Sequence, residues 1–377
     1  MPSIKGKLQF SLPPRETKFE FMRLVAIFFV LVVHALLFWE PGNEELLKSW
    51  AIPIIYLNAG PGIFILITGY FSVFSKSKFW RTLVLLLFLW IVCMIIGIVI
   101  YCCFKFHYDF GNYNWLNVIF LNTKDFQMFW YMNALLVITL LMPVVNFIVT
   151  KYNKWGTLCF FAGILIFAYL FGYTGTDIFE LTTKNKIYNL PETRQLIYLI
   201  CLYGIGGWIR VHFQEKWKNR MFIFGVCYLA LLISVRCILF KFTSDQLSSE
   251  KMHWMVSLFY LSPSPLTGLI AISLFFIVYR INFKECKVWK FLGKTTLLTY
   301  VLHLFIFNLI CYYMWNGTLG CYFSNLSMGN QHLYALLFTI PIVTCISCLL
   351  ILPVTKVQYF LFKKTDLLIT TLKNKLF

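Results

Sequence analysis

Residues 19–39 read FEFMRLVAIFFVLVVHALLFW, an apolar run that contains Arg23 and, eleven residues later, His34. About 20 helical residues are needed to cross a bilayer core roughly 30 Å thick, so this run predicts a membrane-spanning helix. Glu40-Pro41-Gly42 follows it instead of a small-x-small cleavage site. We therefore interpret the run as a membrane helix rather than a cleaved signal peptide.

The two ionisable residues Arg23 and His34 fall on one face of this predicted helix. At about 100° per residue, eleven residues complete three turns plus about 20°, with roughly 16 Å of rise. Ionisable side chains inside a membrane are costly and mark functional sites by default. Two structural interpretations stay open: Arg23 as a snorkelling anchor at the interface, and His34 as a buried neutral histidine bonded to a neighbouring helix.

The rest of the chain repeats this apolar pattern. Of the 377 residues in the whole chain, 60% are hydrophobic and 13% are charged. Soluble domains contain roughly 25% charged residues, about twice as many, so this composition excludes a soluble or disordered protein. The period-two alternation of outer-membrane strands is absent. The sequence predicts an all-α, polytopic integral membrane helix bundle with about ten transmembrane helices. We place these helices at 19–39, 50–74, 82–104, 127–149, 156–173, 195–212, 221–240, 264–281, 296–315 and 332–353.

The distribution of charge predicts the orientation of these helices. The net charge is +18, and 24 of the 33 Lys and Arg residues fall on the N-terminal side of the predicted helices, against 8 on the other side. Because basic residues concentrate in cytoplasmic loops, both termini are predicted to be cytoplasmic. Membrane topology then explains most of the charge without a nucleic-acid partner.

The domain organisation is expected to be simple. We expect a single transmembrane domain over 1–355 and a cytoplasmic amphipathic tail over 356–377. Twelve Cys residues lie mostly in apolar segments, which favours small core residues over a disulfide framework. The CxxC, HExxH and phosphate-loop patterns are absent, so we expect neither a metal site nor an ATP-driven pump.

A second histidine, His303, lies in a polar stripe of the predicted helix 296–315. Thr296, Thr299 and Tyr300 precede it on the same face. A structural hydrogen bond between helices explains this stripe as well as chemistry does.

Basic residues also follow the second predicted helix. Lys76, Lys78 and Arg81 are ordinary cytoplasmic loop charges in one interpretation. In the other, they form a cradle for a phosphorylated ligand, because Lys and Arg bind phosphates directly.

Taken in order, these motifs resemble acyltransferase family 3, a family of membrane-bound acyltransferases of cell-surface sugars, over nearly the whole chain. The family's first signature is an Arg and a His separated by ten residues in the first helix, as Arg23 and His34 are. Its second is a Phe-rich run ending in Ser-Gly-Tyr, and residues 64–70 end in Thr-Gly-Tyr. The family's cytoplasmic Arg-x-x-Arg becomes Lys78-Phe79-Trp80-Arg81, in which lysine keeps the charge but loses the bidentate fork. Similar blocks follow at 129–136, 142–146, 260–263 and 299–303.

The resemblance implies an O-acyltransferase. Its donor would be cytoplasmic acyl-CoA, acetyl-CoA first of all, and its acceptor a hydroxyl group of a cell-surface or lipid-linked glycan. Arg23, Lys78 and Arg81 would then bind the phosphates of the donor at the cytoplasmic edge.

The resemblance also implies catalytic roles. His34 would act as general base on the acceptor hydroxyl, or would carry the acyl group covalently, since an imidazole titrates near neutral pH. His303 would be a second catalytic residue that orients the first. Tyr70 and Trp130 would line the pocket for the sugar or the thioester.

The alternative function is a transporter or exporter of a lipid-linked sugar precursor. Transporters often contain internal repeats with broken helices in corresponding positions. Pro53, Pro61 and Gly62 break the second predicted helix, and no counterpart break occurs in the second half. A sugar polymerase or ligase would be expected to carry a larger charged outer loop. The excess of Lys over Arg, 25 to 8, and the 40 Phe residues favour a bacterial cytoplasmic membrane, whose lipids would be a further partner.

Overall fold

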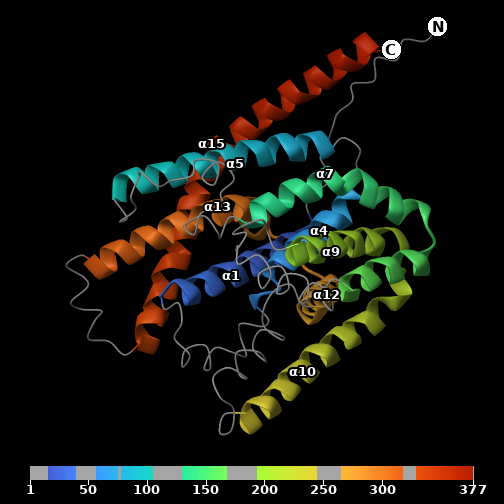
Figure 1. Cartoon of the computed structure of the whole chain (residues 1–377), viewed down its shortest axis with the longest axis horizontal. Helices are drawn as coiled ribbons and strands as arrows, with labels where there is room; N and C mark the ends of the chain where they lie inside the picture. The colour runs from blue at the N-terminus through green and yellow to red at the C-terminus, as the bar shows by residue number, and fades with distance from the viewer. Residues whose placement is uncertain are drawn as a thin grey trace, which may run out of the picture.

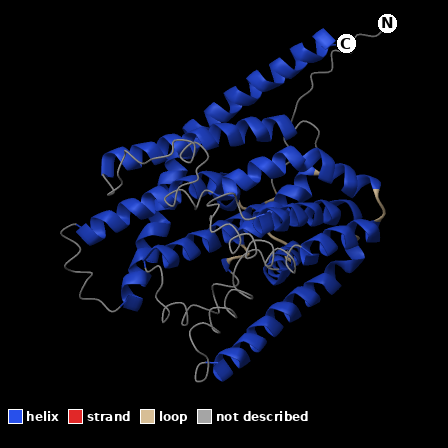
Figure 2. Ribbon diagram, in the orientation of Figure 1, coloured by secondary structure: helices blue, strands red, loops and turns tan. Residues whose placement is uncertain are grey.

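The computed structural model of the chain describes residues 16–39, 57–74, 78–104, 130–167, 193–243, 265–316 and 328–376. Within these ranges all regular structure is helical and no strand occurs (Figure 2). A helix coincides with each of the ten predicted membrane stretches, so the all-α prediction is confirmed. The labelled elements in Figure 1 are α1 (Thr17–Trp39), α4 (Gly60–Ser72), α5 (Lys78–Phe104), α7 (Trp130–Lys151), α9 (Thr193–His212), α10 (Lys218–Thr243), α12 (Pro265–Arg280), α13 (Lys287–Asn316) and α15 (Met328–Leu376). An unlabelled helix spans Lys154–Phe167, and a 3₁₀ turn, η3, spans Glu215–Trp217.

The short helix α4 lies at the centre of the bundle. It packs against α1, α9 and α12, and α13 in turn packs against α1 (Figure 1). Helices α10 and α15 lie farther out, against α12 and α13 respectively. Pro61 stands in the first turn of α4, where a missing N–H group costs no helical hydrogen bond.

Helices α4 and α9 meet backbone to backbone. A Cβ atom added at Gly69 would lie 2.0 Å from the carbonyl oxygen of Tyr203. One added at Gly206 would lie 2.2 Å from the carbonyl oxygen of Leu66. Small residues permit this close approach, which is a common packing device between membrane helices.

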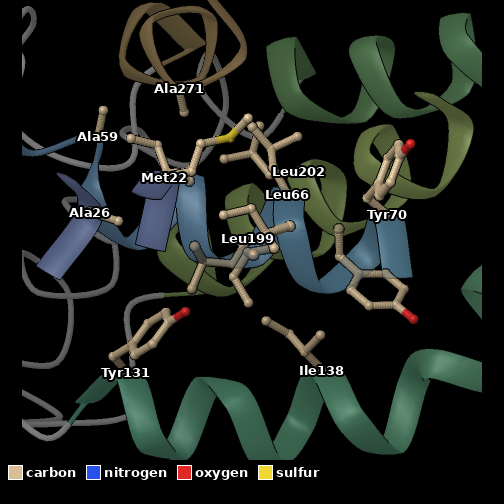
Figure 3. Packing of buried hydrophobic residues seen from close by; sticks show 14 of the residues in the cluster. Met22, Ala26, Ala59, Leu66, Tyr70, Tyr131, Ile138, Leu199, Leu202 and Ala271 are labelled. Carbon is tan, nitrogen blue, oxygen red and sulfur yellow. The ribbon is translucent and has the colours of Figure 1, made fainter. Parts of the chain in front are cut away.

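The buried core is one continuous cluster that joins the helices around α4. Figure 3 shows side chains of five helices meeting there, among them Met22 of α1, Leu66 of α4, Tyr131 of α7, Leu199 of α9 and Ala271 of α12. Met132, Ala134, Leu199 and Leu202 are fully buried. The core therefore fixes the relative positions of α1, α4 and α7, which carry most of the predicted site.

The outer surface of the bundle is apolar, as expected for a protein that contacts lipid tails. Large side chains such as Ile91, Leu140, Leu231 and Leu352 are more than half exposed. Three described helices are long and apolar enough to cross a membrane by themselves, at Tyr131–Lys151, Glu215–Val235 and Ile340–Lys364. Exposed apolar patches of this extent are not tolerated in water.

The helix ends next to the predicted cytoplasmic segments lie together at one end of the bundle. We call this end, which includes Thr17, Val149, His212 and Cys286, the inner end. The backbone N–H of Cys286, before α13, donates to Thr17 Oγ1 at the start of α1 (3.2 Å). His212, at the end of α9, contacts the carbonyl oxygen of Val149 near the end of α7 (3.1 Å). This meeting of alternate helix ends is what the charge pattern predicts.

Helix α15 continues from the bundle into the predicted tail. It runs as one helix from Met328 to Leu376, although Pro341 and Pro353 lie inside it. Its last turns, red in Figure 1, extend away from the other helices. Residues 356–376 therefore form a helical extension of α15.

Candidate active site

The two histidines singled out in the sequence meet across α1 and α13. Nδ1 of His34 lies 2.7 Å from Nε2 of His303, and the two ring planes are 10° apart. His303 is fully buried, whereas His34 is partly exposed. Two residues 269 positions apart in the sequence thus form a hydrogen-bonded pair.

The hydrogen bonds fix where the protons of this pair lie. Nδ1 of His303 contacts the carbonyl oxygen of Tyr300, which can only accept, so Nδ1 carries the hydrogen. In a neutral ring Nε2 then accepts, and the shared hydrogen belongs to Nδ1 of His34. Nε2 of His34 is left with its lone pair, and within the described part of the chain it has no hydrogen-bond partner.

Aromatic side chains enclose the histidine pair from the side of α13 and α7. The rings of Tyr300 and His303 lie 5.4 Å apart, and Tyr131 stands edge-on to Tyr300 at 5.4 Å. Tyr131 and Tyr300 are both about 5% exposed or less. The sequence block around Trp130 therefore reaches the site through Tyr131, while the side chain of Trp130 lies outside the described residues.

At the inner end of α1, Arg23 is held by a buried carboxylate. It forms an ion pair with Glu20, whose side chain is 1% exposed. A Cβ atom on Gly293 of α13 would lie 2.2 Å from Glu20 Oε2, so the glycine makes room for the carboxylate. The guanidinium also lies 5.9 Å from the ring centre of Phe71. Arg23 thus points toward the inner end in a fixed position, on the helix face that leads to His34.

Of the two basic residues at the start of α5, the structure describes the side chain of Arg81 but not that of Lys78. The guanidinium of Arg81 lies 5.9 Å from the ring centre of Phe362, in the extension of α15. The side chain of Lys78 lies outside the described residues. Both residues begin a helix at the inner end, the side on which the sequence places them.

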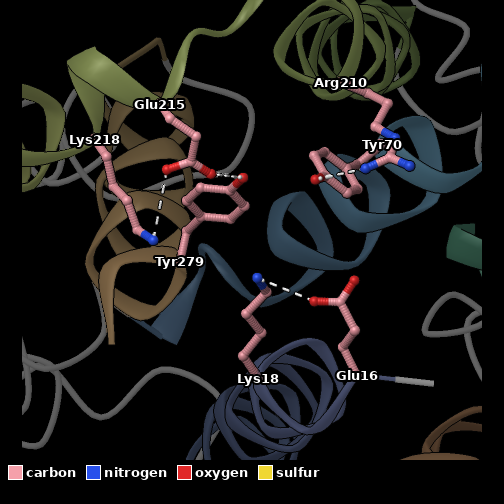
Figure 4. A network of polar contacts seen from close by, with 7 residues as sticks. All are labelled: Glu16, Lys18, Tyr70, Arg210, Glu215, Lys218 and Tyr279. Carbon is pink, nitrogen blue, oxygen red and sulfur yellow. Dashed lines mark hydrogen bonds and ion pairs between the residues drawn. The ribbon is translucent and has the colours of Figure 1, made fainter. Parts of the chain in front are cut away.

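Tyr70 lies at the inner end rather than beside the histidine pair. Its hydroxyl accepts a hydrogen bond from Nη1 of Arg210 (3.0 Å), and its ring packs on Phe19 at 5.0 Å. Only 5% of Tyr70 is exposed. Figure 4 shows this contact beside a second group of polar residues that includes Lys18 and Tyr279.

Two other motif residues join helices. Asn133 of α7 accepts a hydrogen bond from Trp90 Nε1 of α5 (3.2 Å). Asn146 donates to the carbonyl oxygen of Ser72 (3.2 Å) and accepts from the Tyr203 hydroxyl (2.9 Å). Asn146 thereby ties α7 to both α4 and α9 close to the inner end.

Sequence reasoning missed two residues of the candidate site, Glu20 and Arg210. The spacing of Glu20 and Arg23, three residues apart in a helix, was a usable signal for an ion pair. Arg210 carried no such signal, because its partner Tyr70 is 140 residues away. Among the described residues, no cluster of three His, Cys, Asp or Glu side chains is placed to hold a metal ion.

Comparison with known proteins identifies the family of this chain. Residues 16–353 match a family described as an acyltransferase domain, acyltransferase family 3. No curated protein and no solved structure matches the chain. The match begins just before α1, ends within α15, and covers Arg23, Tyr70, Arg81 and both histidines. With most of its length matched and an apolar all-helical fold, this chain belongs to the membrane acyltransferases of family 3.

Proposed function

We propose that the protein transfers an acetyl group from cytoplasmic acetyl-CoA to a hydroxyl group of a cell-surface or lipid-linked glycan. Family membership supports acyl transfer. The choice of donor is supported by the basic inner end, where an anionic cofactor would arrive from the cytoplasm. A bacterial plasma membrane is the setting that the composition favours.

The observation that carries this proposal is the contact between His34 and His303. It orients the His34 ring so that the lone pair on Nε2 is not used in a hydrogen bond to the described residues, while His303 holds the opposite nitrogen. A general base needs this arrangement, with one nitrogen accepting a proton and the other stabilised as the ring becomes positive. In such sites the base acts on the attacking group and is itself oriented by a third group, which here is His303.

The proposed reaction is a direct transfer. The acceptor hydroxyl gives its proton to Nε2 of His34 as its oxygen attacks the thioester carbonyl carbon. The new C–O bond forms, the C–S bond breaks, and the CoA thiolate leaves with the proton from His34. His303 accepts the Nδ1 hydrogen of His34 throughout and does not itself touch the reacting atoms.

The donor would enter from the inner end. Arg23 lies on the same helix face as His34, about 16 Å of helix rise away, which is a span that an extended pantetheine arm can bridge. Arg23 and Arg81 would bind the donor's phosphates, together with Lys78, as charge-assisted contacts.

Binding of acetyl-CoA to the purified full-length protein tests this function. We expect saturable binding by the wild type and by His34→Ala, because His34 acts on the transfer step rather than on the phosphates. Calorimetry on protein in lipid nanodiscs would measure it. A transporter of lipid-linked sugars should not bind acetyl-CoA, so absence of binding would contradict the proposal.

A further inference from the structure

Three cations from three helices gather around two tyrosine rings at the inner end (Figure 4). Lys18 of α1 and Lys218 of α10 both reach Tyr279 of α12, with Nζ at 4.6 Å and 5.4 Å from its ring centre. Arg210 of α9 lies over Tyr70 of α4. The two tyrosine rings are 6.3 Å apart, so these residues form one group, which we call the tyrosine cluster.

Arg210 is the cation of this cluster that is most available to an anion. Its Nη1 donates to the hydroxyl of Tyr70, and its guanidinium carbon lies 5.0 Å from the ring centre. In the described part of the chain no carboxylate pairs with it, and its side chain is exposed. A guanidinium that uses one N–H group in this way has most of its N–H donors left for a ligand.

The two lysines have carboxylate partners that are easily replaced. Lys18 pairs with Glu16 at 3.0 Å, and Lys218 pairs with Glu215 at 3.6 Å. The lysine side chains are 24% and 23% exposed, whereas those of Glu16 and Glu215 are 49% and 71% exposed. Ion pairs with such exposed partners are weak, so a phosphate with two negative charges can displace them.

The tyrosine cluster and Arg23 are connected through one aromatic group. The Phe19 ring packs on Tyr70 at 5.0 Å and on Phe71 at 4.7 Å. Arg210 lies over Tyr70, and Arg23 lies near Phe71. Arg210 and Arg23 therefore lie near two adjacent residues of α4, Tyr70 and Phe71.

This inference rests on acetyl-CoA as the proposed donor. We propose that the tyrosine cluster binds the 3′-phosphate of CoA, while Arg23, together with Arg81 and Lys78, binds the diphosphate. CoA carries phosphate at these two separate points, and its diphosphate is the one next to the pantetheine arm. Arg23 shares the helix face of His34, so the diphosphate belongs there. The 3′-phosphate then falls to Arg210, Lys18 and Lys218, which bind it by charge-assisted hydrogen bonds.

Comparison of CoA with dephospho-CoA, which lacks only the 3′-phosphate, tests this subsite. Dissociation constants would be measured by calorimetry on the full chain in phosphatidylcholine nanodiscs. The wild type should bind CoA about tenfold more tightly or better, as expected for hydrogen bonds to a charged group. Arg210→Gln, and Lys18→Gln with Lys218→Gln, should bring this ratio close to one and leave the affinity for dephospho-CoA unchanged.

A matched control distinguishes binding by the tyrosine cluster from attraction by the overall positive charge of the inner end. Lys290 is another inner-end cation, paired with Glu285 outside the cluster, and Lys290→Gln should keep the wild-type ratio. If Arg210→Gln also keeps that ratio, the subsite is overturned and the proposed donor stands. If the wild type binds neither compound, both fail.

A lipid headgroup offers the same phosphate chemistry, and a second arm distinguishes it. Nanodiscs with added phosphatidylglycerol would be compared with phosphatidylcholine alone by thermal unfolding. Stabilisation of the wild type but not of Arg210→Gln by phosphatidylglycerol, with an unchanged CoA ratio, would assign the cluster to lipid and overturn the proposal.

Discussion

One ring nitrogen, Nε2 of His34, is where the proposed chemistry takes place. Its lone pair is available because Nδ1 of the same ring donates to His303, and His303 is fixed in turn by the carbonyl oxygen of Tyr300. A proton on the wrong nitrogen would leave the base blocked. The tautomer is therefore set by a residue that the reaction does not touch.

Substitution of His303 tests this assignment of the tautomer. His303→Leu should lower kcat about 10²-fold or more with KM for acetyl-CoA unchanged, since a wrong tautomer in a Ser-His-Asp triad costs up to about 10⁴-fold. His303→Gln should restore part of kcat, because its amide oxygen can accept the Nδ1 hydrogen of His34. Steady-state kinetics in reconstituted vesicles measure both, and equal activity of the two variants would contradict the role.

Arg23 and Glu20 need a paired test because each stabilises the other. Arg23→Gln alone removes the ion pair between Arg23 and the buried carboxylate of Glu20, and breaking a buried pair costs about 3–5 kcal/mol. Glu20→Gln with Arg23→Gln removes both charges and should fold better than Arg23→Gln alone. We expect this double variant to raise KM for acetyl-CoA while the protein stays intact, and an unchanged KM would remove Arg23 from the donor site.

At the scale of residues, the sequence indicated which residues belong to the candidate site better than it indicated which of them are in contact. The spacing of Arg23 and His34 indicated one helix face, because helical geometry is local and regular. It could not show that His34 would meet His303 or that Tyr70 would meet Arg210, since both pairs join helices far apart in the chain. The role of Tyr70 in the pocket for the sugar or the thioester stays a prediction, and the structure places this residue at the inner end.

At the scale of elements, the crossing of α4 and α9 holds the centre of the bundle. Gly69 and Gly206 each face a backbone carbonyl group of the other helix, so neither position has room for a methyl group. A side chain there must push the two helices apart rather than move another side chain. Gly163 of the Lys154–Phe167 helix, by contrast, has no atom within 4 Å of the position of an added Cβ.

These glycines give a matched pair of variants. Gly69→Ala or Gly206→Ala should destabilise the protein by about 1–3 kcal/mol or more, as expected for overpacking of a close contact. Gly163→Ala should be neutral or slightly stabilising, because alanine favours the helix over glycine. Thermal unfolding in detergent measures all three, and equal loss of stability in Gly163→Ala would contradict this account of the crossing.

The helices themselves were predictable because each is a long apolar run. All ten predicted stretches contain a helix, and the predicted start and end of α1 and α12 lie within two residues of the observed bounds. The length of α15 was not foreseen. Its helix continues through Pro353, because a helix that begins in the bundle can pass a proline at the cost of a kink or one lost hydrogen bond.

At the scale of the whole molecule, the net charge of +18 is explained by the predicted orientation of the protein in the membrane. Segments rich in Lys and Arg end at the inner end, where contacts such as Lys18 with Tyr279 and Arg81 with Phe362 are formed. The same end would then attract an anionic donor and keep the protein in one orientation in the membrane.

Fusions at the predicted inner and outer sides test the topology. A fluorescent protein after Phe377 should fluoresce and a phosphatase at the same place should be inactive, because the C-terminus is predicted to be cytoplasmic. Truncation fusions after residue 325, in a predicted outer loop, should give the reverse pattern. An active phosphatase at the C-terminus would contradict the orientation.

The most direct test of the central claim is the mass spectrum of surface glycans from cells that lack the gene and are complemented with either the wild type or His34→Ala. We expect acetylated glycans with the wild type, and their loss with His34→Ala at equal membrane expression, since removing a general base costs about 10²–10⁴-fold in rate. His253→Ala, in a predicted outer loop, should behave as the wild type. Acetylation that persists with His34→Ala would contradict the account.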